Sequence, residues 1–160
     1  MRWFLPDEAA TQALGAALAA TRPRSAMLHL DGDLGAGKST LARAMLRALG
    51  VEGPIRSPTY TLIERYPLPQ GDEAWHLDLY RIGDAAELDF LGLDEGAAAL
   101  WLVEWPERGR DALPPADLLL RLAIEGAGRR VECVPLSAVG ESWQTRLSMH
   151  HELRSVLAVE

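Results

Sequence analysis

The sequence contains very little cysteine, lysine or asparagine. Cys133 is the only cysteine among 160 residues, so the chain can form no internal disulfide and no cysteine-based metal cluster, which fits a reducing cytoplasm. Lysine also occurs once, as Lys38, whereas arginine occurs 15 times and asparagine is absent. A single lysine in an arginine-rich chain indicates a position that needs a compact ammonium, where a planar guanidinium would not serve.

Long apolar runs and an excess of positive charge are also missing. The longest stretch without an acidic or basic residue is residues 9–21, which is 13 residues, whereas about 20 are needed to cross a bilayer. We therefore expect no membrane span and a cytoplasmic location. The 16 basic and 23 acidic residues give a net charge of -7, which argues against direct, strong nucleic-acid binding.

The composition and the spacing of apolar residues predict one domain of alternating helices and strands. With 48% apolar and 24% charged residues, the 160 residues form one core, so we predict a single domain over residues 1–160. Helical periodicity covers residues 7–20, 38–50 and 84–99, and a final helix runs from residue 141 to the end. Strands are predicted over residues 26–30, 59–66, 74–81, 100–105, 117–125 and 129–134.

The strongest motif lies between the first predicted strand and the helix that follows it. Residues 32–39, Gly-Asp-Leu-Gly-Ala-Gly-Lys-Ser, match the phosphate-loop pattern G-x4-G-K-[ST] at every fixed position. The glycines let phosphate oxygens approach backbone N–H groups at the start of the helix. Lys38 would neutralise the β- and γ-phosphates, and the Ser39 hydroxyl would bind Mg²⁺. The predicted nucleotide-binding residues of this loop are Asp33, Leu34, Gly35, Ala36, Gly37, Lys38, Ser39 and Thr40.

The absence of asparagine favours ATP as the nucleotide. Guanine-specific phosphate-loop proteins use the motif N-K-x-D, which a chain with no asparagine and no second lysine cannot supply. The strand, loop and helix order also predicts the fold class, a three-layer α/β sandwich of the P-loop NTPase type. Its central sheet is expected to be mostly parallel, with an antiparallel extension from residues 59–66 and 74–81.

Two carboxylates and one threonine are candidates for the hydrolytic chemistry. Glu104 ends an apolar strand, the arrangement of a Walker B element, and Asp78 shares a strand face with His76 and Tyr80. Both acids are predicted near the metal, and the sequence leaves open which one positions the attacking water. A surface acid for Asp78 and an acid at a strand end for Glu104 are the structural alternatives. Thr59 stands where a switch residue would sense the γ-phosphate, although taken alone this segment is more typical of a turn.

Together these motifs resemble one family, TsaE (formerly YjeE), the small P-loop ATPase of the bacterial machinery that makes threonylcarbamoyladenosine in tRNA. The resemblance covers about half of the chain, and its motifs are residues 32–39 (GDLGAGKS), 57–62 (SPTYTL), 76–81 (HLDLYR), 87–92 (ELDFLG) and 103–107 (VEWPE). It implies an ATP-binding, Mg²⁺-dependent protein that works with TsaB and TsaD. It also implies that Asp78 is tied to hydrolysis, Glu104 to the metal site and Thr59 to a switch-like loop.

The predicted function is therefore ATP hydrolysis coupled to this tRNA modification. Lys38, Asp78 and Glu104 are the predicted catalytic residues, Ser39, Asp78 and Glu104 the metal ligands, and Thr59 a further nucleotide-sensing residue. With no lid and no evident arginine finger, the chain alone should hydrolyse ATP slowly and depend on a partner. The net negative charge makes any connection to tRNA indirect. A small-molecule kinase with Asp78 as base, and a nucleotide-dependent adaptor with little hydrolysis, are the alternatives.

Overall fold

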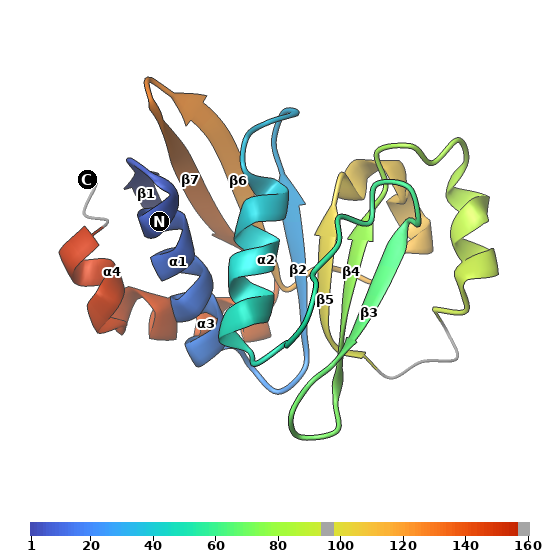
Figure 1. The fold of residues 1–160 in the computed structure, drawn as a ribbon, viewed down its shortest axis with the longest axis horizontal. Helices are drawn as coiled ribbons and strands as arrows, with labels where there is room; N and C mark the ends of the chain where they lie inside the picture. Colours follow the sequence, from blue (N-terminus) through green and yellow to red (C-terminus); the bar gives the residue numbers. More distant parts are fainter. Residues whose placement is uncertain (94–97, 157–160) are drawn as a thin grey trace.

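A mixed sheet of seven strands forms the centre of the computed structural model, which describes residues 1–93 and 98–156 (Figure 1). The strand order is β1-β7-β6-β2-β5-β4-β3. The four central strands β6, β2, β5 and β4 are parallel, and β1, β7 and β3 pair antiparallel at the two edges. The strands are β1 (Arg2–Leu5), β2 (Ala26–Asp31), β3 (Ile63–Pro67), β4 (Glu73–Asp78), β5 (Ala98–Glu104), β6 (Leu118–Glu125) and β7 (Gly128–Pro135).

The α-helices of the described residues cover one face of this sheet. They are α1 (Glu8–Thr21), α2 (Lys38–Ala48), α3 (Ala138–Met149) and α4 (His151–Val156). Side chains such as Leu14, Leu41 and Trp143 pack there against Leu28 and Leu120 of the strands in the main hydrophobic core. Helices α1 and α3 begin at capping residues, since Asp7 and Ser137 each accept a hydrogen bond from a backbone N–H of the first turn. This core fixes the direction in which α2 leaves the loop after β2.

The other face is covered only in part. A smaller cluster around Trp75, Leu77 and Val103 lies under three 3₁₀ helices, η1 (Ala85–Leu91), η2 (Pro106–Arg108) and η3 (Arg110–Ala112). In Figure 1 these segments lie on the side of β4 and β5 away from α1 and α2. Over the described residues, the third layer therefore consists of 3₁₀ helices and loops. The mostly parallel α/β sheet with its antiparallel extension is confirmed.

Several predicted boundaries are wrong for identifiable backbone reasons. The strand predicted from residue 59 begins at Ile63, because residues 58–62 form a turn and Leu62 has a φ of 65°. The strand predicted to residue 81 ends at Asp78. The acidic segment forms 3₁₀ helix η1, which Gly92 ends with a φ of 67°, a conformation that glycine adopts without a steric cost.

The C-terminal segment and the N-terminal strand also differ from the prediction. The final helix begins at Ala138 and breaks at His150 before α4, and residues 94–97 and 157–160 of predicted helices lie outside the described residues. Strand β1 was not predicted, because its four residues pair with β7 at the far end of the chain. Within residues 1–93 and 98–156, no helix has the length and apolar character that a membrane span requires.

Candidate functional site

The loop between β2 and α2 has an open backbone arrangement that depends on glycine. Gly32, Gly35 and Gly37 have φ values of 149°, 80° and 102°. At Gly32 a Cβ atom would lie 2.4 Å from the carbonyl oxygen of Leu122, so only glycine fits against β6. No side chain caps the first turn of α2, which leaves its N–H groups available to an anion.

Lys38 is the first residue of α2, and its ammonium is held inside the loop. The side chain is 4% exposed, and its Nζ donates hydrogen bonds to the carbonyl oxygens of Gly32 and of Asp33, the latter at 2.9 Å. The same Nζ lies 4.3 Å from the centroid of the Trp105 ring. The loop therefore holds a buried ammonium beside the ends of the neighbouring strands. The space is suited to a compact ammonium, as the single lysine indicated.

Asp78 and Glu104 lie side by side because β4 and β5 are parallel neighbours in register. The two residues are paired across the strands, and their exposed fractions are 4% and 2%. Ser39 Oγ donates to both oxygens of Glu104, at 2.9 and 3.0 Å, and His76 Nε2 lies 2.7 Å from Glu104 Oε1. A hydroxyl, a carboxylate and an imidazole thus meet at one point beside the loop.

Asp78 is connected to a different segment of the chain. Its Oδ2 accepts a hydrogen bond of 3.1 Å from Thr59 Oγ1, and its Oδ1 accepts one of 2.9 Å from the backbone N–H of Tyr80. Its own N–H donates to the carbonyl oxygen of Leu62 at 3.0 Å. The turn over residues 58–62 is therefore hydrogen-bonded to both the side chain and the backbone N–H of Asp78. Asp78 is therefore not the surface acid of its structural alternative, whereas Glu104 does end β5, as its alternative stated, and is buried there.

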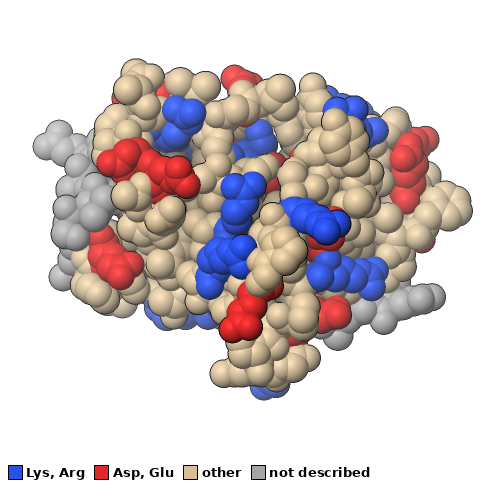
Figure 2. All heavy atoms as spheres, viewed as in Figure 1, with Lys and Arg blue, Asp and Glu red and all other residues tan. Residues whose placement is uncertain are grey.

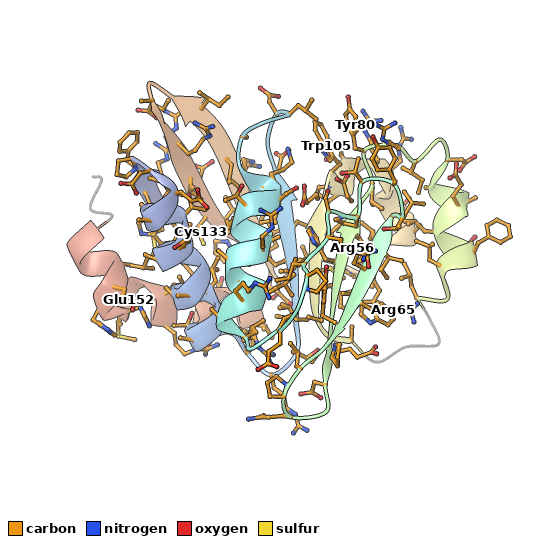
Figure 3. All side chains as sticks on the ribbon, in the orientation of Figure 1. Arg56, Arg65, Tyr80, Trp105, Cys133 and Glu152 are labelled. Atoms are coloured by element: carbon orange, nitrogen blue, oxygen red, sulfur yellow. The ribbon has the colours of Figure 1, made fainter. Side chains whose placement is uncertain are left out.

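These groups surround one cavity of about 330 Å³, within the range of small-molecule sites. Of the predicted residues, Asp33 and Ala36 do not line it, because Ala36 is buried in the main core and Asp33 contributes its carbonyl oxygen to Lys38. Trp105, Tyr80 and Arg81 line it without having been predicted as site residues, and Tyr80 and Trp105 lie together beyond the ends of β4 and β5 (Figure 3). The predicted residues that line it are Leu34, Gly35, Gly37, Lys38, Ser39, Thr40, Thr59, Asp78 and Glu104.

Comparison with known families shows to which family the chain belongs. A family model described as "Threonylcarbamoyl adenosine biosynthesis protein TsaE" matches residues 5–131, a range that contains every predicted site residue. The chain belongs to the TsaE family. The resemblance noted from the sequence motifs is thereby confirmed.

Individual TsaE relatives match over most of their length. The tRNA threonylcarbamoyladenosine biosynthesis protein TsaE of Haemophilus influenzae is 36% identical over 146 residues, which cover 87% of this chain and 92% of that protein. The TsaE of Bacillus subtilis is 32% identical over 161 residues, covering 96% and 97%. The crystal structure of Bacillus subtilis YdiB matches with a TM-score of 0.78 and 27% identity over 94% of this chain and 95% of that one. The fold and the connection to tRNA threonylcarbamoyladenosine biosynthesis are therefore shared with this family.

The donor atoms of this TsaE chain fit a magnesium ion. Ser39 and Glu104 offer hard oxygen atoms that already contact each other. Within the described residues no three His, Cys, Asp or Glu side chains gather into a ready metal cluster. Mg²⁺ characteristically takes one or two protein oxygens and completes its shell with phosphate and water, so a sparse donor set beside a phosphate loop suits it.

Proposed function

We propose that this TsaE family member binds ATP with Mg²⁺ and hydrolyses it as a component of the tRNA threonylcarbamoyladenosine machinery, together with TsaB and TsaD. The observation that carries the proposal is the meeting of four groups around one cavity: Lys38 in its loop, Ser39 at the start of α2, and the paired carboxylates Asp78 and Glu104. We further propose that it does so in the cytoplasm.

Phosphate binding is assigned to the loop and to Lys38. The backbone N–H groups at the start of α2 would donate to the β-phosphate, and the Lys38 ammonium would neutralise charge on the β- and γ-phosphates. Lys38 is oriented for this role by its hydrogen bond to Asp33 and by the Trp105 ring above it. Trp105 can hold this position because it takes a left-handed backbone conformation, with a φ of 55°, at the end of β5.

The nucleoside of ATP is assigned to the side of the loop away from Asp78 and Glu104. A second cavity of about 220 Å³ shares Gly37 and Thr40 with the first and lies between the start of α1 and the hairpin of β6 and β7. Its walls include Thr11 and Arg129. Because Asp78 and Glu104 occupy the γ-phosphate side, the sugar and base extend toward this second cavity. The first helix thus forms one wall of the nucleoside site.

The two carboxylates have different neighbours, which supports different roles. Glu104 contacts the Ser39 hydroxyl, so these two residues would hold Mg²⁺, which when bound withdraws charge from the phosphates. His76, protonated at Nε2, would donate a hydrogen bond to the Glu104 carboxylate and keep it oriented. Asp78 instead accepts hydrogen bonds from Thr59 and from the Tyr80 backbone, and is suited to orienting the attacking water. Thr59 connects the 58–62 turn to this step.

Titration calorimetry with Mg–ATP and a turnover assay test the proposal. Wild type should bind ATP, and Lys38→Ala should weaken binding by about 100-fold, because a buried charged partner of the phosphates is lost. Arg24→Ala, which removes an exposed cation before β2, at the other end of that strand, is the control and should bind as wild type does. Turnover by the wild type should rise when a TsaB–TsaD complex is added. Absence of ATP binding, or equal rates with and without the complex, would contradict the proposal.

A further inference from the structure

Of the described residues, two basic side chains line the nucleotide cavity, Lys38 and Arg81. Lys38 is buried, and its ammonium donates hydrogen bonds to carbonyl oxygens of its own loop. Arg81 is exposed and lies beyond the end of β4, three residues after Asp78. The charge of Lys38 alone does not balance the two acids of the cavity, Asp78 and Glu104. The second cation therefore makes the cavity better suited to a negatively charged Mg²⁺–triphosphate.

The Arg81 guanidinium has no polar partner in the described part of the chain. Residues 1–93 and 98–156 give it neither an ion pair nor a hydrogen bond, and it lies over the Tyr60 ring, 4.5 Å from the ring centroid. Tyr60 is itself 82% exposed. The guanidiniums of Arg65 and Arg108 also lie over aromatic rings, but each donates to a backbone carbonyl oxygen at 2.8 Å. Arg81 therefore keeps its N–H donors available for another acceptor.

The backbone that carries Arg81 is held in place. The N–H of Leu79 donates to the carbonyl oxygen of Glu104 at 3.1 Å, and the N–H of Ile82 donates to the carbonyl oxygen of Leu79 at 3.2 Å. Both Leu79 and Ile82 are buried in the smaller hydrophobic cluster. The turn over residues 79–82 thus fixes the start of the Arg81 side chain at the cavity. The exposed side chain itself can still change rotamer, which is a fast motion at a protein surface.

We infer that Arg81 is a catalytic residue, which leaves the Tyr60 ring and contacts the γ-phosphate oxygens of ATP during hydrolysis. The inference rests on the proposed function and adds a residue to it. A planar guanidinium can donate two parallel hydrogen bonds to phosphate oxygens, which an ammonium such as that of Lys38 cannot do. In other P-loop NTPases an arginine, from the same chain or from a partner, stabilises the charge of the transferring phosphoryl group.

The step that Arg81 would stabilise is transfer of the γ-phosphoryl group to water. The oxygen of the water that Asp78 orients bonds to the γ-phosphorus, while the bond from that phosphorus to the β–γ bridging oxygen breaks and its electron pair stays on ADP. One proton of the water remains on the released phosphate, and the other passes to solvent. Because the Tyr60 ring and the phosphate compete for one guanidinium, only a fraction of the molecules is in the productive state. This competition fits slow turnover by the chain alone.

Other basic side chains on the same face provide a control. Figure 2 shows basic side chains gathered at the centre of this face, over α2 and the segment beside it, and Figure 3 places Arg56 on that segment. Within the described ranges Arg56, like Arg81, is exposed and has no acidic side chain within ion-pair distance. It does not line the cavity. Substitution of Arg56 therefore removes a comparable charge without touching the site.

A transition-state analogue tests the assignment without turnover. Aluminium fluoride mimics the transferring phosphoryl group, and it should tighten binding of Mg–ADP to the isolated wild type by about 100-fold, measured by calorimetry. Arg81→Ala should lose most of this tightening and still bind Mg–ADP alone as the wild type does, which also shows that it is folded. Arg81→Lys keeps the charge but loses the planar fork, and should recover only part of the effect. Arg56→Ala should behave as the wild type does.

Turnover measurements test the same residue and its contact with Tyr60. With a saturating TsaB–TsaD complex, Arg81→Ala should lower kcat by about 100-fold or more and leave KM nearly unchanged. In the isolated chain, Tyr60→Leu removes the competing ring and should raise turnover by about three-fold, the effect of an exposed cation–π contact. The same substitution should have no effect in the Arg81→Ala background. An equal rise in both backgrounds would contradict the competition.

The outcomes separate this inference from the proposed function. If the wild type binds neither Mg–ATP nor Mg–ADP, the proposed function is wrong and the role of Arg81 falls with it. If the wild type hydrolyses ATP and Arg81→Ala keeps both its rate and its response to aluminium fluoride, the proposed function stands and Arg81 is not catalytic. Equal losses of Mg–ADP binding with and without the fluoride would also overturn the inference, because Arg81 would then contribute to nucleotide binding only.

Discussion

Charged side chains gather in two regions of the sheet, and the two regions differ in burial. At the carboxyl ends of β2, β4 and β5, Lys38, Asp78 and Glu104 are each no more than 4% exposed. On the outer face of β2, β6, β7 and β1, charged side chains form an exposed ladder across neighbouring strands. In the first region the carboxylates accept hydrogen bonds from the hydroxyls of Ser39 and Thr59, whereas in the second they pair with exposed arginine side chains.

The ladder consists of three successive ion pairs. Asp31 lies 3.9 Å from Arg121, Arg121 lies 3.3 Å from Glu132, and Glu132 lies 3.1 Å from Arg2. Hydrogen bonds from the Arg2 side chain, and then from that of Arg121, lower the pKa of Glu132. Exposed pairs of this kind contribute little to stability because water already solvates both partners.

The comparison separates charges that are costly to bury from charges that remain solvated. Burying an ionised group costs free energy that neighbouring charges and hydrogen bonds only partly recover. The cluster at the cavity is therefore not explained by the stability of the sheet, which supports the proposal that its charges serve a function that needs them out of bulk water. By the same argument, substitutions in the ladder should change the stability of the protein little. Four substitutions, in order of decreasing expected effect, test this contrast.

The largest effect is expected at the buried carboxylates. Asp78→Asn should lower ATP turnover in the presence of the TsaB–TsaD complex by about 100-fold, since an amide orients the attacking water poorly, while calorimetry shows ATP binding retained. Glu104→Gln should instead raise the Mg²⁺ concentration needed for half-maximal turnover by about ten-fold. Asp31→Asn, in the ladder, is the control and should change neither quantity. Full function of the complex with Asp78→Asn would favour the adaptor alternative.

A smaller effect is expected at His29, which lies between the two regions. His29 is on β2 and lines a surface cavity with Asp31 and Glu107, and burial lowers its pKa from 6.5 to about 4. The folded protein therefore favours neutral His29, so the stability linked to this group is fully present above pH 6.5 and is lost as the pH falls toward 4.

Replacing His29 removes this pH dependence. Between pH 7 and pH 4.5 the free energy of unfolding should fall further for the wild type than for His29→Gln. The difference should be on the order of 1 kcal/mol, because the His29 side chain is only partly buried. Urea unfolding at the two pH values measures both changes. Parallel losses of stability in the two proteins would show that His29 carries no such linkage.

The smallest effect is expected at the centre of the ladder. Glu132→Gln removes the carboxylate shared by Arg2 and Arg121, yet its melting temperature should stay within experimental error of the wild type at physiological salt, because all three groups remain hydrated. Thermal unfolding by circular dichroism gives the comparison. A clear fall in melting temperature would mean that exposed charges stabilise this sheet. It would contradict the contrast between the buried cluster at the cavity and the exposed ladder.

The parts of the site that could be predicted have local signals in the sequence. The loop over residues 32–39 is defined by glycine, lysine and serine at fixed spacing, and the alternation along β4 placed Asp78 with His76. Glu104 was found because an apolar strand ends in an acid. In each case the residues that determine the geometry are neighbours in sequence.

The parts that were not predicted depend on contacts between distant segments. Trp105 reaches Lys38 only because β5 pairs with β2, and nothing near Trp105 in the sequence indicates that pairing. The hydrogen bond between Thr59 and Asp78 required the 58–62 turn, which the left-handed backbone at Leu62 produces in a segment that otherwise resembles a strand. Arg81 enters the cavity because β4 ends at Asp78, three residues before it.

The solitary lysine also has a consequence for chemical labelling. Lys38 supplies the only side-chain amine of the 160 residues, and that amine lies in the loop beside the cavity. A reagent that acylates primary amines can therefore react at the amino terminus and at one side chain, Lys38. Acylation of Lys38 reports on the cavity. The fraction of Lys38 that carries an acyl group, located by mass spectrometry of peptides, would serve as a gauge of occupancy with no engineered label.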